Sequence, residues 1–226
     1  MKVKLYKPFE QWYHGGTIWL ISDTHFADPD CEYMCDHWPT PEEHIKIINK
    51  YVGKNDTLIH LGDVGDFNWA KHLKGYKVLL LGNHDKGASN YQKKWNFYVT
   101  ENDKFDREFK TYEEAKEYLD EMSSDGINTR DIRIISNGLF NEVYEGPIFI
   151  NEKICLSHEP IDLKFGINIY GHVHQGERSI SWANTRAQIN VCSDVRGFKP
   201  VRLDDLISEF KTIDIHRVII DKASKK

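Results

Sequence analysis

The chain has 226 residues, of which 40% are hydrophobic and 29% are charged, and this composition excludes a disordered protein. The formal net charge of −5 provides no general attraction for nucleic acid or anionic lipid. We find no apolar run long enough to span a membrane and no signal peptide. The four cysteines therefore favour reduced thiols in the cytoplasm.

Short apolar runs rich in β-branched residues predict buried strands. These runs lie at 17–22, 57–61, 76–81, 148–150, 153–156, 167–170 and 188–192. Between the first two, Thr40, Pro41 and Glu43 form a helix-start signature, and Gly53 ends the amphipathic pattern. A shorter helical pattern at 67–73 precedes the third strand. This alternation predicts an α/β fold with a largely parallel first sheet, and the later strands predict a mixed portion.

The segment at about 87–144 differs in composition, because it is polar and rich in aromatic residues. Thr111 and Glu114 form a second capping box, followed by an amphipathic stripe, so we expect this segment to be helical. We predict one domain over residues 1–226, with this segment inserted as a cap. The alternative is a peripheral helical layer with no part in substrate choice.

Side chains that commonly bind metals follow five of the predicted strands, at the ends where α/β sheets bind ligands. They lie in Asp23-Thr24-His25, Gly62-Asp63-Val64-Gly65-Asp66, Gly82-Asn83-His84-Asp85, Ser157-His158-Glu159 and Gly171-His172-Val173-His174. Residues two apart in an extended chain point to the same side. Asp23 and His25 can therefore face one point, and so can His172 and His174. The glycines before Asp63, Asn83 and His172 are expected to allow sharp turns as the chain leaves the sheet.

The ordered set D-x-H, G-D-x-x-D, G-N-H-D, H and G-H-x-H resembles the calcineurin-like metallophosphoesterase superfamily. These motifs run from Asp23 to His174, about two-thirds of the chain. Asn190-Val191 and Lys199-Pro200-Val201 further resemble the closing strand and tail of its small bacterial and phage phosphoesterases. The resemblance implies two packed mixed β-sheets flanked by helices, with two metal ions at the strand ends.

The same resemblance implies a dinuclear metal centre. The expected ligands of the first metal are Asp23, His25 and His174, and those of the second are Asn83, His158 and His172. Asp63 is expected to bridge the two ions. Carboxylate, amide and imidazole ligands without a thiolate suit Mn²⁺, Fe, Zn²⁺ or Ni²⁺ better than Ca²⁺. These ligand types do not select one ion, and we expect Mn²⁺ first.

The resemblance also implies hydrolysis of a phosphoester by a hydroxide that bridges the two metals. His84 would be the general acid that protonates the leaving oxygen, with Asp66 as its orienting carboxylate. Asp85 is an alternative orienting group, or simply a turn residue. The other histidines are expected at core or surface positions, with His60 in the core or beside the ligands.

The substrate is narrowed by a departure from the superfamily pattern. Phe67 and Asn68 follow Asp66 where the serine/threonine protein phosphatases have Arg-Gly, which disfavours a protein substrate. We therefore expect a small phosphodiester or phosphomonoester, and no membrane partner. Trp38, Tyr33 and Trp95 either line the substrate wall or serve in packing. The sequence does not indicate an oligomeric state.

Two other functions remain as alternatives. A nuclease acting on short nucleic acids would share the metal chemistry, but the negative net charge does not favour a nucleic-acid partner. A catalytically silent scaffold of the same fold would be expected to have lost ligands or the acid. All seven ligand positions and His84 are filled here by competent residue types.

Overall fold

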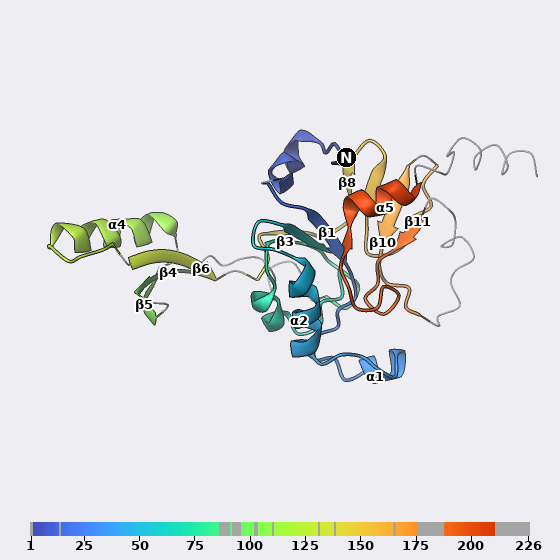
Figure 1. Ribbon diagram of the computed structural model, residues 1–226, viewed down its shortest axis with the longest axis horizontal. Helices are drawn as coiled ribbons and strands as arrows, with labels where there is room; N and C mark the ends of the chain where they lie inside the picture. The colour runs from blue at the N-terminus through green and yellow to red at the C-terminus, as the bar shows by residue number, and fades with distance from the viewer. Residues whose placement is uncertain are drawn as a thin grey trace, which may run out of the picture.

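Two β-sheets form the body of the protein in a computed structural model (Figure 1). The residues that it describes are 2–13, 15–85, 91, 96–101, 104–109, 111–130, 132–137, 139–164, 166–175 and 188–210. All seven strands predicted for the body are present, so the predicted α/β fold with two mixed sheets and flanking helices is confirmed.

The first sheet has five strands, and four of them are parallel. Their order is β12 (Val201–Arg202), β1 (Ile18–Ile21), β2 (Thr57–His60), β3 (Tyr76–Leu80) and β7 (Glu142–Tyr144). Strands β1, β2, β3 and β7 are parallel neighbours, and β12 pairs antiparallel with β1 at the edge. The parallel βαβ arrangement expected for the first 85 residues is therefore confirmed.

The second sheet has four strands and is also mixed. Their order is β11 (Gln188–Asn190), β10 (Ile167–Tyr170), β9 (Ile154–Leu156) and β8 (Ile148–Asn151). Strands β9, β10 and β11 are parallel, whereas β8 pairs antiparallel with β9. The main core lies between the two sheets, where Leu20, Ile59 and Val78 belong to the same buried cluster as Leu156 and Ile169. Alternate residues of each strand point into this core because side chains in a strand alternate between its faces.

Helices flank the two sheets of this body. They are η1 (Lys7–Tyr13), α1 (Cys31–Met34), α2 (Pro41–Tyr51), η2 (Phe67–His72) and α5 (Leu203–Phe210). Helix α2 begins at the predicted capping box of Thr40, and its Ile48 packs on the outer face of the first sheet beside Ile21 and Leu58. Leu206 of α5 completes the core between the sheets. Within the described ranges, no helix is both long and apolar enough to cross a bilayer.

The segment predicted to be a helical insertion also contains a small sheet. Its strands, in sheet order, are β5 (Lys104–Phe109), β4 (Asn96–Glu101) and β6 (Ile132–Asn137), and its helix is α4 (Tyr112–Ser124). The predicted capping box at Thr111 starts α4, as expected, but the prediction of a helical segment missed the three strands. Ile132 and Ile134 show the period of two that indicates a strand, a signal hidden by the polar composition.

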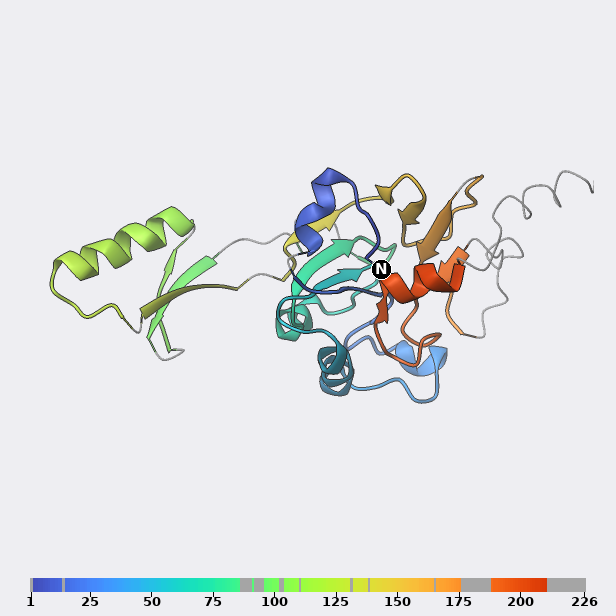
Figure 2. The same ribbon diagram turned by 45° about the horizontal axis from the view of Figure 1, so that its top comes forward.

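The same segment lies to one side of the two-sheet body in both Figure 1 and Figure 2. Near its predicted end at about residue 144, β7 pairs with β3 in the first sheet from Glu142 onward. The connection from β3 to β7 therefore carries the additional sheet and helix.

We predict that His44 makes the stability of the protein depend on pH. His44 lies on the buried face of α2 against the rings of Phe26 and Phe198, and burial lowers its pKa from 6.5 to about 3 despite an opposing interaction with the Thr24 backbone. As the pH falls below 6.5, the unfolded chain binds a proton that the folded chain does not, so stability falls with pH. One such proton changes the free energy of unfolding by up to about 1.4 kcal/mol per pH unit.

The measurement is urea denaturation between pH 5 and pH 7. His44→Leu should show a shallower loss of stability on acidification than the unchanged protein. His72→Leu, at an exposed position of η2, is the control and should follow the unchanged protein. Parallel curves for all three proteins would refute the prediction.

Candidate metal centre

The ends of six parallel strands meet at one edge of the body. A parallel bridge pairs Ser22, just after β1, with Cys192, just after β11. The Ser22 N–H donates to the Val191 carbonyl at 3.1 Å, and the Ser193 N–H donates to the Ser22 carbonyl at 2.9 Å. These bonds join the two sheets at their carboxyl ends, so the loops that follow β1, β2, β3, β9 and β10 converge there.

One cluster at this edge contains Asp23, His25 and His174, the residues predicted for the first metal. One ligand atom from each lies within 4.8 Å of the others. His174 Nε2 is 3.6 Å from Asp23 Oδ1, and the two histidine rings are 5.3 Å apart between centroids. Asp23 is completely buried, and the other two side chains are nearly so.

A second cluster contains Asp63, His158 and His172, which also offer ligand atoms within 4.8 Å of one another. The predicted ligand Asn83 joins them, because its Oδ1 lies 2.8 Å from His158 Nε2 and 3.0 Å from His172 Nδ1. The structure therefore brings together all four residues that were expected around the second metal.

Asp63 lies between the two clusters. Its Oδ2 is 3.3 Å from His158 Nε2 in the second cluster and 3.8 Å from His25 Nε2 in the first. Its Oδ1 accepts a hydrogen bond of 2.9 Å from the His84 N–H. One carboxylate thus faces both groups of ligands, which is the placement that a bridging residue requires.

Four of the predicted ligands have left-handed backbone conformations. The φ angles are 56° at Asp23, 40° at His25, 55° at Asp63 and 67° at His172. Positive φ is uncommon outside glycine, although Asp and His tolerate it better than most residues. Such conformations persist only where the surrounding structure enforces them, and they concentrate at functional sites.

The three glycines expected at turns have two different roles. Gly62 has the positive φ, 105°, that a sharp turn can require, whereas Gly82 and Gly171 do not have a positive φ. A Cβ on Gly82 would collide with Asp63, and one on Gly171 would collide with Ser22 and Asp23. These two glycines let neighbouring ligand loops pack directly against one another.

Each histidine of the clusters that faces inward through Nε2 has a partner for its other ring nitrogen. Nδ1 of His25 lies 3.0 Å from Asp28 Oδ2, and Nδ1 of His174 lies 3.2 Å from Asp194 Oδ1. Nδ1 of His158 donates to the Leu61 carbonyl at 2.8 Å. Such contacts orient metal-binding histidines and set their tautomer. Sequence reasoning missed Asp28 and Asp194, since neither falls in a spaced motif.

Metal ions fit the chemistry of these residues. Among the described residues, neither Asp23 Oδ1 nor His25 Nε2 has a hydrogen-bond partner, although both atoms are buried. Leaving such atoms unsatisfied is costly. Two ligands of one transition-metal ion at ordinary bond lengths are separated by about 3 to 3.5 Å. The 3.6 Å between His174 and Asp23 is close to that spacing.

The electrostatics of the second cluster also favour a cation. Burial would raise the pKa of Asp63, but its hydrogen bond and charge interaction with His158 lower the pKa below its ordinary value. Burial would likewise lower the pKa of His158, but Asp63 and Asp23 raise it. The carboxylates therefore favour a positive charge at this point, which a divalent ion would supply in place of a proton on His158.

A model of the calcineurin-like phosphoesterase family matches residues 16–191, which include both clusters. The chain belongs to this family. The resemblance recognised in the motifs is thereby confirmed, and the family description implies metal-dependent hydrolysis of phosphoesters. No curated protein matches the chain significantly.

A solved structure supports the fold of this calcineurin-like phosphoesterase. It is a protein of unknown function from Aquifex aeolicus, with 21% sequence identity and a TM-score of 0.55. The match covers 85% of the present chain and 98% of the Aquifex chain. At this identity the similarity concerns the fold alone.

The predicted catalytic pair of this phosphoesterase is not in contact. The exposed His84 lies beside the first cluster, with its ring 5.8 Å from that of His25. Asp66 does not orient it among the described residues, since Asp66 Oδ1 accepts from the N–H and the side-chain amide of Asn68 at 3.0 and 2.9 Å. Asp66 instead caps the start of η2, where free N–H groups attract a carboxylate.

Asp85 connects the two loops that carry Asp63 and Asn83. Its Oδ2 accepts hydrogen bonds from the N–H groups of Asp63 and Gly82 at 2.9 and 2.8 Å. Its Oδ1 accepts from the Val64 N–H and the Tyr91 hydroxyl, both at 3.1 Å. Sequence reasoning considered Asp85 only as a partner of His84 or a turn residue. Its observed bonds hold the ligand loops.

Three aromatic residues were considered as a wall of the substrate site. Among those that the structure describes, only Trp38 lies at the site. The centroid of its half-buried ring lies 6.0 Å from the ring centroid of His25, 5.9 Å from that of His174 and 5.3 Å from that of Phe198. Tyr33 is 90% exposed and therefore makes little contact with the body. Trp95 lies outside the described residues.

We predict that Asp85→Asn weakens metal binding by the second cluster. The amide keeps one acceptor oxygen and turns an NH₂ group toward backbone donors, so at least one charge-assisted hydrogen bond is lost. We expect the free energy of unfolding to fall by about 2 kcal/mol. Isothermal titration with Mn²⁺ and urea denaturation measure the two effects.

Asp66→Asn is the matched control for this change. The amide oxygen can still accept from Asn68, and the site is exposed, so both quantities should stay near their original values. Equal effects of the two substitutions would contradict the role of Asp85 in holding the loops.

Proposed function

We propose that the protein hydrolyses a small phosphodiester or phosphomonoester with two divalent transition-metal ions, of which Mn²⁺ is the first candidate. The observation that carries this proposal is the position of Asp63 Oδ2, which faces His158 in one cluster and His25 in the other. Asp23, His25 and His174 would hold one ion, and Asn83, His158 and His172 the other. Asp63 would be shared.

The charges of the site suit an anionic substrate when the ions are present. Two divalent ions would activate the attacking water as Lewis acids and would outweigh the two carboxylate charges of Asp23 and Asp63, so that a phosphoryl group is attracted. Asp28 and Asp194 would keep the rings of His25 and His174 oriented. The buried setting of these residues excludes bulk water from the ligand side of the site.

His84 is the proposed general acid. Its backbone N–H is fixed by Asp63 Oδ1, which places the residue beside the clusters, while its ring remains exposed to an incoming substrate. An imidazole there can donate a proton to the leaving oxygen. We do not extend this proposal to Asp66, because its Oδ1 accepts from Asn68 and neither of its oxygens contacts His84 among the described residues.

The test is hydrolysis of bis(p-nitrophenyl) phosphate and p-nitrophenyl phosphate with Mn²⁺, Fe²⁺, Zn²⁺ or Ni²⁺. We expect metal-dependent turnover that a chelator abolishes. His84→Ala should lower kcat by about 10²- to 10⁴-fold without changing the metal content, because the acid is lost and the ligands are kept. Asp66→Asn and the exposed His72→Ala should keep near-normal turnover.

The outcomes separate the alternatives. A metal-loaded protein that hydrolyses neither ester at any pH would refute the catalytic proposal and favour a scaffold. Cleavage of short oligonucleotides alone would favour a nuclease. A loss of metal from His84→Ala would make His84 a ligand and would contradict its role as the acid.

Trp38 supports a preference for aromatic esters. Its position beside His25 and His174 places an aromatic face next to the first cluster, and stacking of a base or aryl ring on such a face contributes about 1–3 kcal/mol. Bis(p-nitrophenyl) phosphate and methyl p-nitrophenyl phosphate share one leaving group and differ in the second ester group. Trp38→Leu should reduce the ratio of their kcat/KM values by about tenfold.

Tyr33→Leu changes an aromatic residue of the same loop that is exposed, and it should leave this ratio unchanged. An equal loss of kcat/KM for both esters with Trp38→Leu would indicate that Trp38 only packs against the histidines. That result would contradict the proposed substrate preference.

We also propose that residues 1–226 form a single domain with an insertion. The support is that β3 and β7, which flank the additional sheet and helix, are neighbours in one sheet. The four cysteines are all free, which supports a reducing compartment such as the cytoplasm.

A further inference from the structure

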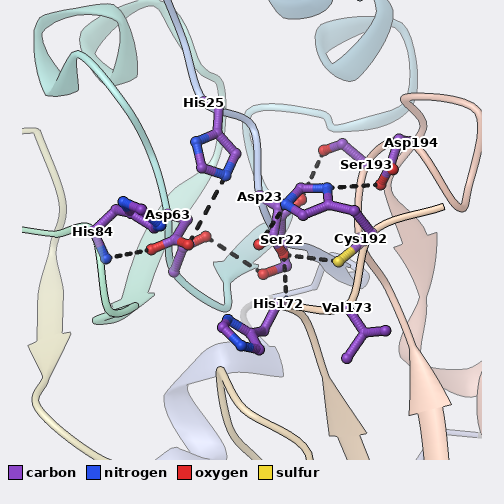
Figure 3. Close-up of polar contacts among 12 residues, drawn as sticks. Ser22, Asp23, His25, Asp63, His84, His172, Val173, Cys192, Ser193 and Asp194 are labelled. Carbon is purple, nitrogen blue, oxygen red and sulfur yellow. Dashed lines mark hydrogen bonds and ion pairs between the residues drawn. The ribbon is translucent and has the colours of Figure 1, made fainter. Parts of the chain in front are cut away.

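Cys192 lies next to Asp23 of the first cluster, and the proposed reaction gives it no role. It follows β11, is completely buried, and pairs through its backbone with Ser22. Its Sγ lies 3.0 Å from Asp23 Oδ2 (Figure 3). The sequence showed only an isolated cysteine near the end of a strand, so this contact comes from the fold.

The two oxygens of Asp23 have different surroundings. Oδ2 is bonded by two donors, the Cys192 thiol and the His172 N–H at 2.9 Å. Oδ1 is buried, has no hydrogen-bond partner among the described residues, and lies 3.6 Å from His174 Nε2. Two donors on one oxygen fix the rotation of the carboxylate and leave the other oxygen facing the histidines of the cluster.

The thiol is better placed as a donor than as a metal ligand. Its sulfur contacts Asp23 Oδ2, whereas Asp23 Oδ1 is the oxygen that lies 3.6 Å from His174 Nε2, and a thiolate at 3.0 Å from that carboxylate would be repelled. Sγ also lies within 4.8 Å of ligand atoms of His174 and Asp194, so ligation is the alternative that an experiment must separate.

We propose that Cys192 is a positioning residue for the first metal site. Its thiol donates to Asp23 Oδ2 and thereby holds Asp23 Oδ1 in the orientation that binds the ion. This inference rests on the proposed function only in taking Asp23, His25 and His174 as a metal site. It does not require that the protein turn over any particular ester.

The test compares Cys192→Ala with Cys192→Ser in the full chain. Alanine removes the donor, whereas serine keeps a hydroxyl donor at nearly the same place. Groups that orient metal ligands typically change metal affinity by about 10- to 100-fold when removed. In isothermal titration with Mn²⁺, Cys192→Ala should weaken binding of one ion about tenfold or more, and Cys192→Ser should recover most of the loss.

Cys155 provides a matched control in the same sheet. It is buried on β9, and within the described chain its Sγ makes one weak hydrogen bond, to the Leu156 carbonyl at 3.8 Å. Cys155→Ala and Cys155→Ser should change Tm while leaving Mn²⁺ affinity unchanged. If Cys192→Ala and Cys192→Ser weaken Mn²⁺ binding equally, Cys192 serves only in packing and the proposal is refuted.

Cobalt substitution separates positioning from ligation. The unchanged protein loaded with Co²⁺ should lack a thiolate-to-cobalt charge-transfer band in the near ultraviolet. A band that disappears in Cys192→Ser would make Cys192 a ligand and would overturn the proposal. Metal binding without hydrolysis would refute the proposed function alone, whereas failure to bind any divalent ion would refute both.

Discussion

The short pairing between Ser22 and Cys192 is the contact on which the site depends. Each sheet alone carries only part of the ligand set, with Asp23, Asp63 and Asn83 after strands of one and the histidines of the later motifs after strands of the other. The backbone bonds at Ser22 bring these strand ends to a common edge. The apolar residues between the sheets keep them packed, but they do not by themselves set the alignment of the ligand loops.

The backbone conformations at the site are unfavourable in free energy, and ligand binding can offset this. Left-handed conformations at residues such as Asp23 and Asp63 are disfavoured by about 1–3 kcal/mol each, and unpartnered buried atoms add to this. An ion that binds only the folded chain stabilises it in proportion to the logarithm of its concentration over Kd. Ions bound at these clusters would therefore link metal supply to folding stability.

The sequence predicted the candidate ligands of the site better than the residues that orient those ligands. The clustering of candidate ligands such as Asp23 and His174 could be predicted because residue type, order and strand-end position all pointed to the same chemistry. Asp28, Asp194 and Cys192 could not, because a partner of a ligand needs only to be near it in space. Asp66 was expected to orient His84; in the structure its Oδ1 accepts from Asn68 instead, a local hydrogen bond that competes with any longer-range contact.

The connection between the parallel neighbours β3 and β7 contains more structure than their pairing requires. Parallel neighbours need a crossover of a dozen or more residues in any case, and here the crossover contains a sheet and a helix of its own. Near its start, the Tyr91 hydroxyl donates to Asp85 and so ties the crossover to the ligand loops. Because the sheet of β5, β4 and β6 is separate from both sheets of the body, the strand pairing that holds the candidate metal centre does not depend on what this crossover contains.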